Sequence, residues 1–373
     1  MRRTLLVTND FPPRVGGIQS YVHELASRLA ADRLTVLASD YPGSAQFDRD
    51  QPFAVVRYPS SMLLPTAGVK RMAADLIRSN RIDAVWFGAA APLGLMTPYL
   101  RSVGIHKVVA STHGHEVGWS MLPGTRQMLR RIGSESDVVT FVSRYSRRRI
   151  SVACGPNAAL EALSPGVDAT LFRPDSAARA QIRSRYGLGD APTVVCVSRL
   201  VPRKGQDVLI AVWPTVVRSH PGARLLIVGG GSDETRIRKL AAGSVVSHLI
   251  TLTGRVPYAE LPAHYQAGDI FAMPCRTRGR GLDVEGLGIV FLEASACGLP
   301  VIAGASGGAP ETVIDGETGL VVNGRSQSDL ARALVRLLAD PDLAARWGAA
   351  GRTWVRTQWT WAASAERLAA LLD

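Results

Sequence analysis

The stretch TLLVTNDFPPRVGGIQSYVHELA, residues 4–26, holds the pattern on which the fold depends. It opens on the apolar run TLLVT, passes through a turn rich in Pro and Gly, and ends in a segment with apolar residues three and four positions apart. The first part is typical of a buried parallel strand, and the last part is typical of an amphipathic helix. We therefore expect a β-strand that leads through a tight loop into an α-helix.

The same alternation continues along the whole chain. In the first half, apolar runs and helical patterns predict strands at 4–8, 34–39, 83–88, 107–112 and 137–143, with helices at 18–30, 70–80 and 92–103. Residues 159–175 have a connector-like composition, after which the alternation restarts. The second half predicts strands at 193–199, 223–231, 249–254, 269–274, 299–304 and 319–322, and helices at 205–219, 233–242, 262–268, after Glu285, and at 326–338, 342–356 and 359–372. This order predicts an α/β fold with two doubly wound parallel sheets.

Composition describes a globular protein with two cores. The chain has 373 residues, 46% of them hydrophobic and 20% charged, which suits two domains. No apolar run reaches the roughly 20 residues of a spanning helix, and the apolar stretch at the N-terminus is too short for a signal peptide. The four cysteines are scattered, which favours reduced thiols in a cytoplasm over a metal site or a disulfide framework.

The positive charge is concentrated in the first half. Net charge is +12, and residues 1–167 hold 20 Lys and Arg against 12 Asp and Glu. Such a surface attracts nucleic acid, anionic lipid or phosphorylated substrates. An arginine-rich composition with no functional cause is an equal alternative, because nearly all the cations are arginine.

Two loops at strand ends have the composition of anion sites. Gly16 and Gly17 precede a helix, so backbone and helix N-terminus can approach a ligand closely, although a plain tight turn is the alternative. The segment around Gly16 and Gly17 is not a dinucleotide fingerprint.

Arg199 and Lys204 lie five positions apart after a buried strand, and a guanidinium with an ammonium suits a pyrophosphate. The alternative for this pair is solvated surface charge.

The segment EGLGIVFLE, residues 285–293, is neither an ordinary strand nor an ordinary surface helix. Gly286 and Gly288 weaken a strand interior but permit an unusual turn before a helix that begins near Gly288. The free N–H groups of residues 289–291 would then face a ligand at the helix start. Glu285 and Glu293 would flank that ligand and accept sugar hydroxyls. The alternative is one capping glutamate and one exposed glutamate.

Three polar residues follow strands of the first half. His113 and His115 flank a glycine after the fourth strand, and Asp10 ends the first strand. Ligands in such sheets bind at the carboxyl ends of the strands, so these side chains are candidates for a ligand site. We find no His/Cys cluster and no Asp-x-Asp pair suited to a metal.

Taken together, these motifs resemble the retaining glycosyltransferases of family 4, which have the GT-B fold. The resemblance covers essentially the whole chain. It rests on PPRVGGIQSYVHELA, the SPGVD connector, SRLVPRKG, LIVGGG, LTGRV, the Glu-x7-Glu segment with EASACGLPVIAG, and GGAPETVIDGETGLVV. It implies an acceptor domain at 1–167 and a donor domain at 168–356 facing across a cleft, with a last helix at 357–373 that crosses back onto the first domain.

The resemblance also implies roles for individual residues. Arg199 and Lys204 would neutralise the nucleoside diphosphate, together with Gly17 and with Gly288, Ile289, Val290 and Phe291 at the helix start. Glu293 would hold the ribose, Glu285 the transferred hexose, and Val256 the base through its backbone. His113 would act beside the reacting sugar, with Asp10 and His115 on the acceptor. No cofactor would be required, because fixed cations replace a metal's charge.

THGHE (112–116) and RTRGRGLDVEGLGIVFLEA (276–294) resemble actinobacterial phosphatidylinositol mannosyltransferases, in particular the group that adds a second, α-1,6-linked mannose. This implies GDP-mannose as donor, a phosphatidylinositol mannoside as acceptor, and a place in the cytoplasm on the inner face of the plasma membrane, where the basic domain meets anionic lipid. It also implies retention of configuration by front-face attack. The sequence offers no carboxylate nucleophile for a double displacement.

Three other functions stay open from the sequence. A family relative could transfer GlcNAc from UDP-GlcNAc to soluble inositol phosphate, or an epimerase could share the fold. A non-catalytic nucleotide-sugar or nucleic-acid-binding protein is the alternative of another class. The absence of a helix-turn-helix or an aromatic-basic platform argues against nucleic acid as a partner.

Overall fold

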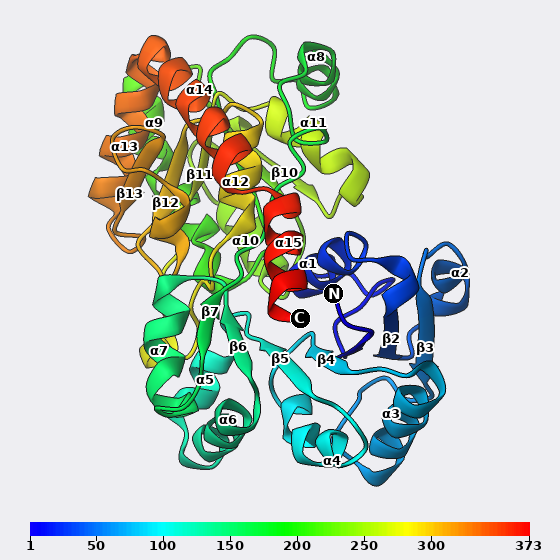
Figure 1. Ribbon diagram of the computed structural model, residues 1–373. Helices are drawn as coiled ribbons and strands as arrows, with labels where there is room; N and C mark the ends of the chain where they lie inside the picture. Colours follow the sequence, from blue (N-terminus) through cyan, green and yellow to red (C-terminus); the bar gives the residue numbers. More distant parts are fainter. The chain divides into compact units, whose positions relative to one another are not determined.

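The computed structural model describes residues 1–373, which form two compact units. One unit comprises Met1–Gly166 together with Trp361–Asp373, and the other comprises Val167–Thr360. Each unit is built around one parallel sheet with helices packed on it (Figure 1). The predicted pair of parallel-sheet, Rossmann-like domains is confirmed.

The first unit contains a seven-stranded parallel sheet in the order β3-β2-β1-β4-β5-β6-β7. Its strands are β1 (Thr4–Thr8), β2 (Leu34–Ser39), β3 (Ala54–Tyr58), β4 (Ala84–Phe87), β5 (Lys107–Ser111), β6 (Val138–Phe141) and β7 (Leu160–Ala162). Its helices are α1 (Gly17–Ala26), η1 (Ala31–Arg33), α2 (Ser44–Arg49), α3 (Ala67–Asn80), η2 (Leu93–Met96), α4 (Thr97–Ser102), α5 (Glu116–Met121), α6 (Pro123–Glu135), α7 (Arg144–Cys154) and α15 (Trp361–Leu371).

The second unit contains a six-stranded parallel sheet in the order β10-β9-β8-β11-β12-β13. Its strands are β8 (Thr193–Val197), β9 (Arg224–Val228), β10 (Ile250–Gly254), β11 (Ile270–Met273), β12 (Val301–Gly304) and β13 (Gly319–Val322). Its helices are α8 (Ser176–Arg185), η3 (Pro202–Lys204), α9 (Gln206–Ser219), α10 (Glu234–Ala242), η4 (Ser247–Leu249), η5 (Tyr258–Glu260), α11 (Leu261–Gln266), η6 (Gly279–Gly281), α12 (Ile289–Ala296), η7 (Ala309–Thr312), α13 (Gln327–Ala339) and α14 (Pro341–Gln358).

The sequence predicts the five central strands of the first sheet and all six strands of the second sheet, including its edge strands β10 and β13. Every residue of β1, β4 and β8 is buried, so these strands read as continuous apolar runs. The edge strands β3 and β7 were missed, since β3 is half-exposed and β7 has only three residues. The strand β7 lies inside the connector-like stretch 159–175, which also holds the boundary between the two units at Gly166 and Val167. Helices α2 and α5 to α8 were missed as well.

The last helix, α15, belongs to the first unit although it ends the chain. It packs on α1, where the Trp361 ring meets the Tyr21 ring edge-on with centroids 5.8 Å apart. The Ser364 hydroxyl donates to the carbonyl of Ser164 over 2.8 Å. Figure 1 shows this red helix beside the blue one. The first core is therefore completed by a segment more than 300 positions from α1 in the sequence.

Candidate active site

In the second unit, the carboxyl ends of β8 and β11 lead into the segments that carry the predicted donor residues. The strand β8 leads into Arg199 and η3, and the segment after β11 leads through Glu285 into α12. Because β8 and β11 are neighbours in the sheet, the two segments meet at one edge. Lys204 and Glu285, 81 positions apart in the sequence, are in direct contact there.

Lys204 and Glu285 form a buried ion pair. The Lys204 Nζ lies 2.7 Å from Glu285 Oε2, and both residues are 7% exposed. Burial alone would raise the pKa of Glu285, but the Lys204 ammonium and the Arg203 guanidinium outweigh burial and hold this pKa below its usual value. The alternative of solvated charge is therefore wrong for Lys204. Arg199 differs, since its side chain is exposed and it makes no ion pair within the chain.

Glu293 has a different environment from Glu285. It lies in α12, is 7% exposed, and accepts a hydrogen bond from the Tyr265 hydroxyl over 2.6 Å. No cation is paired with it, so burial raises the pKa of Glu293 to about 7, against the opposing effects of Tyr265 and Lys204. The alternative of one capping and one exposed glutamate is wrong, because neither side chain is exposed and neither caps the helix.

The helix α12 begins where the sequence predicts. Gly288 precedes it with φ 91°, in the left-handed region, and a Cβ there would lie 2.7 Å from the Phe291 ring. The N–H groups of Ile289 and Val290 have no partner within the chain. The N–H of Phe291 differs from expectation, because it donates to the Gly288 carbonyl over 3.1 Å. Two of the three expected N–H groups therefore remain for a ligand.

Val256 lies just after β10 and is half-buried, and its contact with the base stays a prediction. Gly17 is the first residue of α1 in the first unit, and a Cβ placed there would meet no atom within 4 Å. The loop before Gly17 is anchored by Arg57, which donates to the carbonyl of Pro12 over 2.6 Å and pairs with Asp48 over 2.7 Å.

The candidate acceptor residues lie at the carboxyl ends of β1 and β5 in the first unit. His113 Nε2 lies 2.6 Å from the carbonyl oxygen of Gly88, so this nitrogen carries the hydrogen and Nδ1 is left as an acceptor. Burial lowers the pKa of His113, partly offset by the Glu116 carboxylate, so the ring is neutral near pH 7. Asp10 accepts a hydrogen bond from Gln19 over 2.6 Å, and His115 is exposed.

Three residues near the candidate site escaped the sequence reasoning. Glu116 is fully buried and accepts from the backbone N–H groups of His113 and Gly114 over 2.9 and 3.1 Å. Arg203 lies beside Lys204 and reaches both Asp283 and Glu285. Tyr265 binds Glu293. Position within THGHE and SRLVPRKG could have indicated the first two. No sequence signal links Tyr265 to a glutamate 28 positions away.

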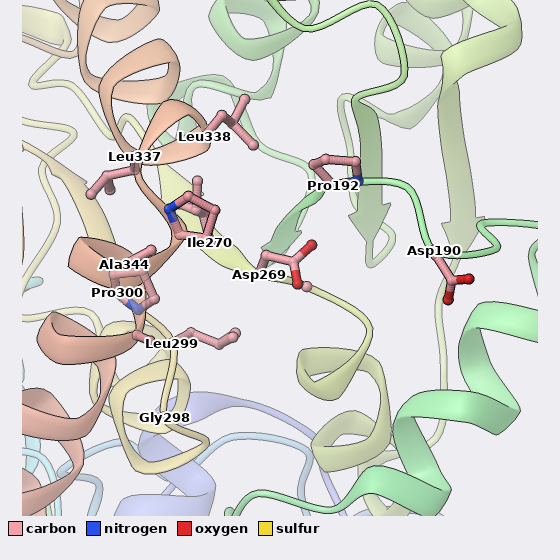
Figure 2. Close-up of a pocket in the computed structure, with 13 residues that line it drawn as sticks. Asp190, Pro192, Asp269, Ile270, Gly298, Leu299, Pro300, Leu337, Leu338 and Ala344 are labelled. Carbon is pink, nitrogen blue, oxygen red and sulfur yellow. The ribbon is translucent and has the colours of Figure 1, made fainter.

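A pocket of about 380 Å³ lies at the opposite edge of the second sheet. It is lined at the amino ends of β8, β11 and β12 by Pro192, Ile270 and Pro300, with Asp190 and Asp269 on its wall (Figure 2). None of the predicted site residues lines it, and its two carboxylates do not suit a diphosphate. No group of three or more His, Cys, Asp or Glu side chains is arranged to hold a metal ion.

Comparison with known proteins identifies the class. A family model described as "Glycosyltransferase Family 4" matches residues 15–171, and one described as "Glycosyl transferases group 1" matches residues 178–354. The chain belongs to glycosyltransferase family 4, as its full-length relatives also show, and it is an enzyme of that class. The resemblance found in the sequence is confirmed.

The relatives are closely similar over their whole length. The GDP-mannose-dependent alpha-(1-6)-phosphatidylinositol monomannoside mannosyltransferase of Mycobacterium tuberculosis is 57% identical, with 100% of this chain and 98% of that protein covered. The corresponding protein of Corynebacterium glutamicum, named for a monoacylated acceptor, is 50% identical with the same coverage.

Solved structures agree on the fold. The structure of Anabaena Alr3699/HepE in complex with UDP matches with a TM-score of 0.86 at 18% identity, covering 100% of this chain and 99% of that one. A sucrose-phosphate synthase from Thermosynechococcus elongatus matches with a TM-score of 0.80 at 23% identity, covering 99% and 98%. The predicted GT-B fold is confirmed.

Proposed function

We propose that this enzyme transfers mannose from GDP-mannose to a phosphatidylinositol monomannoside and forms an α-1,6 linkage. The observation that carries the proposal is the 57% identity, over essentially full length, with a mycobacterial enzyme named for that donor and acceptor. Relatives named D-inositol 3-phosphate glycosyltransferase match less well, at 36% identity over 58% of this chain. The UDP-GlcNAc alternative and the non-catalytic alternative are therefore not favoured.

The donor is proposed to bind to the second unit. The diphosphate binds to Arg199, Lys204 and the N–H groups at the start of α12. Glu293 accepts hydrogen bonds from the ribose hydroxyls, and Glu285 accepts them from the mannose hydroxyls. The exposed and unpaired Arg199 guanidinium supports this assignment, because it is free to form a bidentate contact with phosphate. Val256 offers its backbone to guanine.

The reaction proceeds by attack of an acceptor hydroxyl on the anomeric carbon. The new C–O bond forms on the face from which the bond to the diphosphate breaks, and a donor phosphate oxygen takes the hydroxyl proton. GDP leaves with the bonding electrons. Negative charge grows on the diphosphate during this step, so the fixed cations Arg199 and Lys204 stabilise the transition state most.

The acceptor is proposed to bind to the first unit, beside His113, Asp10 and His115. The unprotonated Nδ1 of His113 would accept a hydrogen bond from one sugar hydroxyl, and the Asp10 carboxylate would accept one from another. Gly17 at the start of α1 would approach the diphosphate through its N–H.

The assignment is tested by label transfer. The purified enzyme is given radiolabelled GDP-mannose or UDP-GlcNAc, with phosphatidylinositol, its monomannoside and inositol phosphate offered in parallel. Labelled lipid from GDP-mannose and the monomannoside alone is expected. A soluble product from UDP-GlcNAc and inositol phosphate would overturn the proposal, as would the absence of lipid product with every acceptor.

We also propose that the first unit binds the inner face of the plasma membrane. Helices α5, α6 and α7 pack together (Figure 1). They expose apolar side chains as well as arginines that have no carboxylate partner. We call this the α5–α7 surface, formed by Met121, Leu122, Met128 and Val152 with Arg126, Arg130, Arg131, Arg147, Arg148 and Arg149. Each arginine near an anionic bilayer contributes about 1 kcal/mol to binding. No helix of the chain is long and apolar enough to span a bilayer.

Sedimentation with vesicles tests the membrane proposal. Replacing Arg147, Arg148 and Arg149 with Gln should reduce binding to vesicles containing phosphatidylinositol. Replacing the exposed Arg218, Arg346 and Arg356 of the second unit is the matched control and should leave binding unchanged. Equal binding of both variants, or equal binding of the wild type to neutral and anionic vesicles, would contradict the proposal.

A further inference from the structure

Arg203 is a cation at the donor site to which the proposed function gives no role. We propose that Arg203 is a positioning residue for Glu285, which it keeps ionised and in place when the donor diphosphate takes Lys204 as its counter-ion. This inference rests on the proposed function, in which Lys204 binds the diphosphate and Glu285 binds the transferred sugar.

The geometry places two cations on one carboxylate oxygen. Glu285 Oε2 lies 2.7 Å from Lys204 Nζ and 3.7 Å from Arg203 Nε. The other end of the Arg203 guanidinium donates from Nη1 to Asp283 Oδ1 over 3.1 Å. The buried Nε of Arg203 has no hydrogen-bond partner, so it is available to Glu285 if that carboxylate shifts by a few tenths of an ångström.

Lys204 cannot pair equally closely with the Glu285 carboxylate and with the donor diphosphate. When a diphosphate approaches the ammonium, Glu285 has to share its closest cation with a group of the same sign as itself. A buried carboxylate beside a like charge gains a proton, since both burial and repulsion disfavour the ionised form. Arg203 is the cation that stays with Glu285 in that state, because its other contact is Asp283 and not the diphosphate.

The other groups that face Glu285 do not replace Arg203. Arg199 is exposed and has a weaker effect on the Glu285 pKa than Lys204 or Arg203. The Cys275 thiol is neutral, because burial raises its pKa to about 12. The Ser306 hydroxyl accepts from the Glu285 backbone N–H over 3.4 Å and carries no charge.

Arg203 also fixes the loop that leads into Glu285. Its carbonyl accepts the N–H of Arg276 over 2.8 Å, at the start of that loop, and its side chain holds Asp283 near the end. Two backbone hydrogen bonds between Arg278 and Asp283, of 2.8 and 3.2 Å, close the intervening turn. Arg203 therefore positions Glu285 in two ways, through the hydrogen bonds that fix the loop and through its positive charge.

The test is the pH profile of kcat at saturating donor and acceptor, where ionisation of His113 and Glu293 is common to all variants. Arg203→Gln should shift the acidic limb of the profile upward by about 1–2 pH units, so that part of its lost activity returns as the pH is raised. Arg203→Lys should keep a profile close to that of the wild type. Affinity for GDP should change less than about threefold, because Arg203 does not bind the diphosphate.

Arg276→Gln is the matched control. It removes another half-buried arginine, which pairs with Asp207 over 2.7 Å, and leaves both cations on Glu285. Its acidic limb should not move. If Arg203→Gln does not fold, Asp283→Asn provides a second test. That change releases the loop but keeps both cations beside Glu285, so kcat should fall uniformly over the pH range, and a wild-type kcat would contradict positioning.

Three results with Arg203→Gln would overturn the inference: an unshifted acidic limb, a loss of GDP affinity of tenfold or more, or an effect confined to the KM of the acceptor. The last two would make Arg203 a substrate ligand. Glu285→Gln separates this failure from that of the proposed function. If Glu285→Gln keeps wild-type activity, the sugar-binding role of Glu285 is wrong. If Glu285→Gln is inactive and Arg203→Gln has an unshifted profile, only the present inference fails.

Discussion

Glu285 and Glu293 share a residue type and a degree of burial but differ in protonation. Glu285 has two cations within 4 Å and stays ionised, with its pKa below the usual value. Glu293 has a neutral phenol as its partner, and its pKa rises to about 7. A carboxylate with pKa near 7 takes up or releases a proton in response to a ligand, so donor binding should be coupled to pH through Glu293.

The affinity for GDP should therefore rise with pH between 6 and 8. Ribose hydroxyls donate hydrogen bonds, and the ionised carboxylate accepts them better than the protonated one. Glu293→Gln should weaken GDP binding about tenfold at pH 8, a loss of about 1.4 kcal/mol, and by less at pH 6. Calorimetric titration at the two pH values measures this.

Glu317→Gln, an exposed isosteric change, is the control for that titration. The β-phosphate of GDP also loses a proton near pH 6, so the pH dependence that survives in Glu293→Gln is that of the nucleotide. The same pH dependence in wild type and Glu293→Gln would contradict the ribose role.

The effect of Glu293 on folding stability has the opposite dependence on pH. The folded protein holds this proton up to about pH 7 and the unfolded chain only to its ordinary value of 4.5, so this group lowers stability as pH rises through that window.

At the scale of elements, α12 combines a core helix with an open N-terminus. Six of its eight residues are buried, including Phe291, which packs edge-on against Phe271 with centroids 5.8 Å apart. Burial of that one ring contributes roughly 1.5–3 kcal/mol. The helix can therefore point two free N–H groups at a ligand without fraying, because its body is held by the core.

Gly288→Ala should damage both functions of this element. A left-handed non-glycine residue costs about 1–2 kcal/mol, and the added Cβ would also meet the Phe291 ring. We expect a loss of about 2–4 kcal/mol in the free energy of unfolding of the second unit, with weaker GDP binding. Urea denaturation and calorimetric titration measure the two effects.

Gly316→Ala is the control, because Gly316 has φ 79° but open space around the Cβ position. It should cost only the backbone strain, about 1–2 kcal/mol, and leave GDP affinity unchanged. Equal losses in the two variants would mean that the contact with Phe291 has no part in setting the helix start.

At the scale of the molecule, the chain returns to its first unit after completing the second. Trp361 is 6% exposed and packs on Tyr21, whose ring in turn lies edge-on to His113 with centroids 4.9 Å apart. The Tyr21 hydroxyl donates to the carbonyl of Leu163 over 2.7 Å. The C-terminal helix thus supports the residue that packs against a candidate catalytic histidine.

Trp361→Ala should destabilise the first unit by about 3–5 kcal/mol, since a buried tryptophan leaves a large cavity. Hydrogen exchange should accelerate in β1, β4 and β5, while β8 and β11 keep their protection. Trp347→Ala, which removes a buried tryptophan of α14 in the second unit, should give the reverse pattern. Faster exchange in both units from either change would contradict this division of the core.

The sequence by itself determined the buried strands, the two parallel sheets and the start of α12, because burial on both faces and a required glycine leave local signals, whereas β3, β7 and five of the helices left no signal that was recognised. The chemistry of the site depended on tertiary structure. Residues 81 positions apart form the Lys204–Glu285 pair, and Tyr265 reaches Glu293 from another helix. The protonation of a buried carboxylate is set by the charges and dipoles that folding brings within a few ångströms. Those neighbours come from elements distant in the chain, so no local pattern could have predicted which glutamate would be ionised.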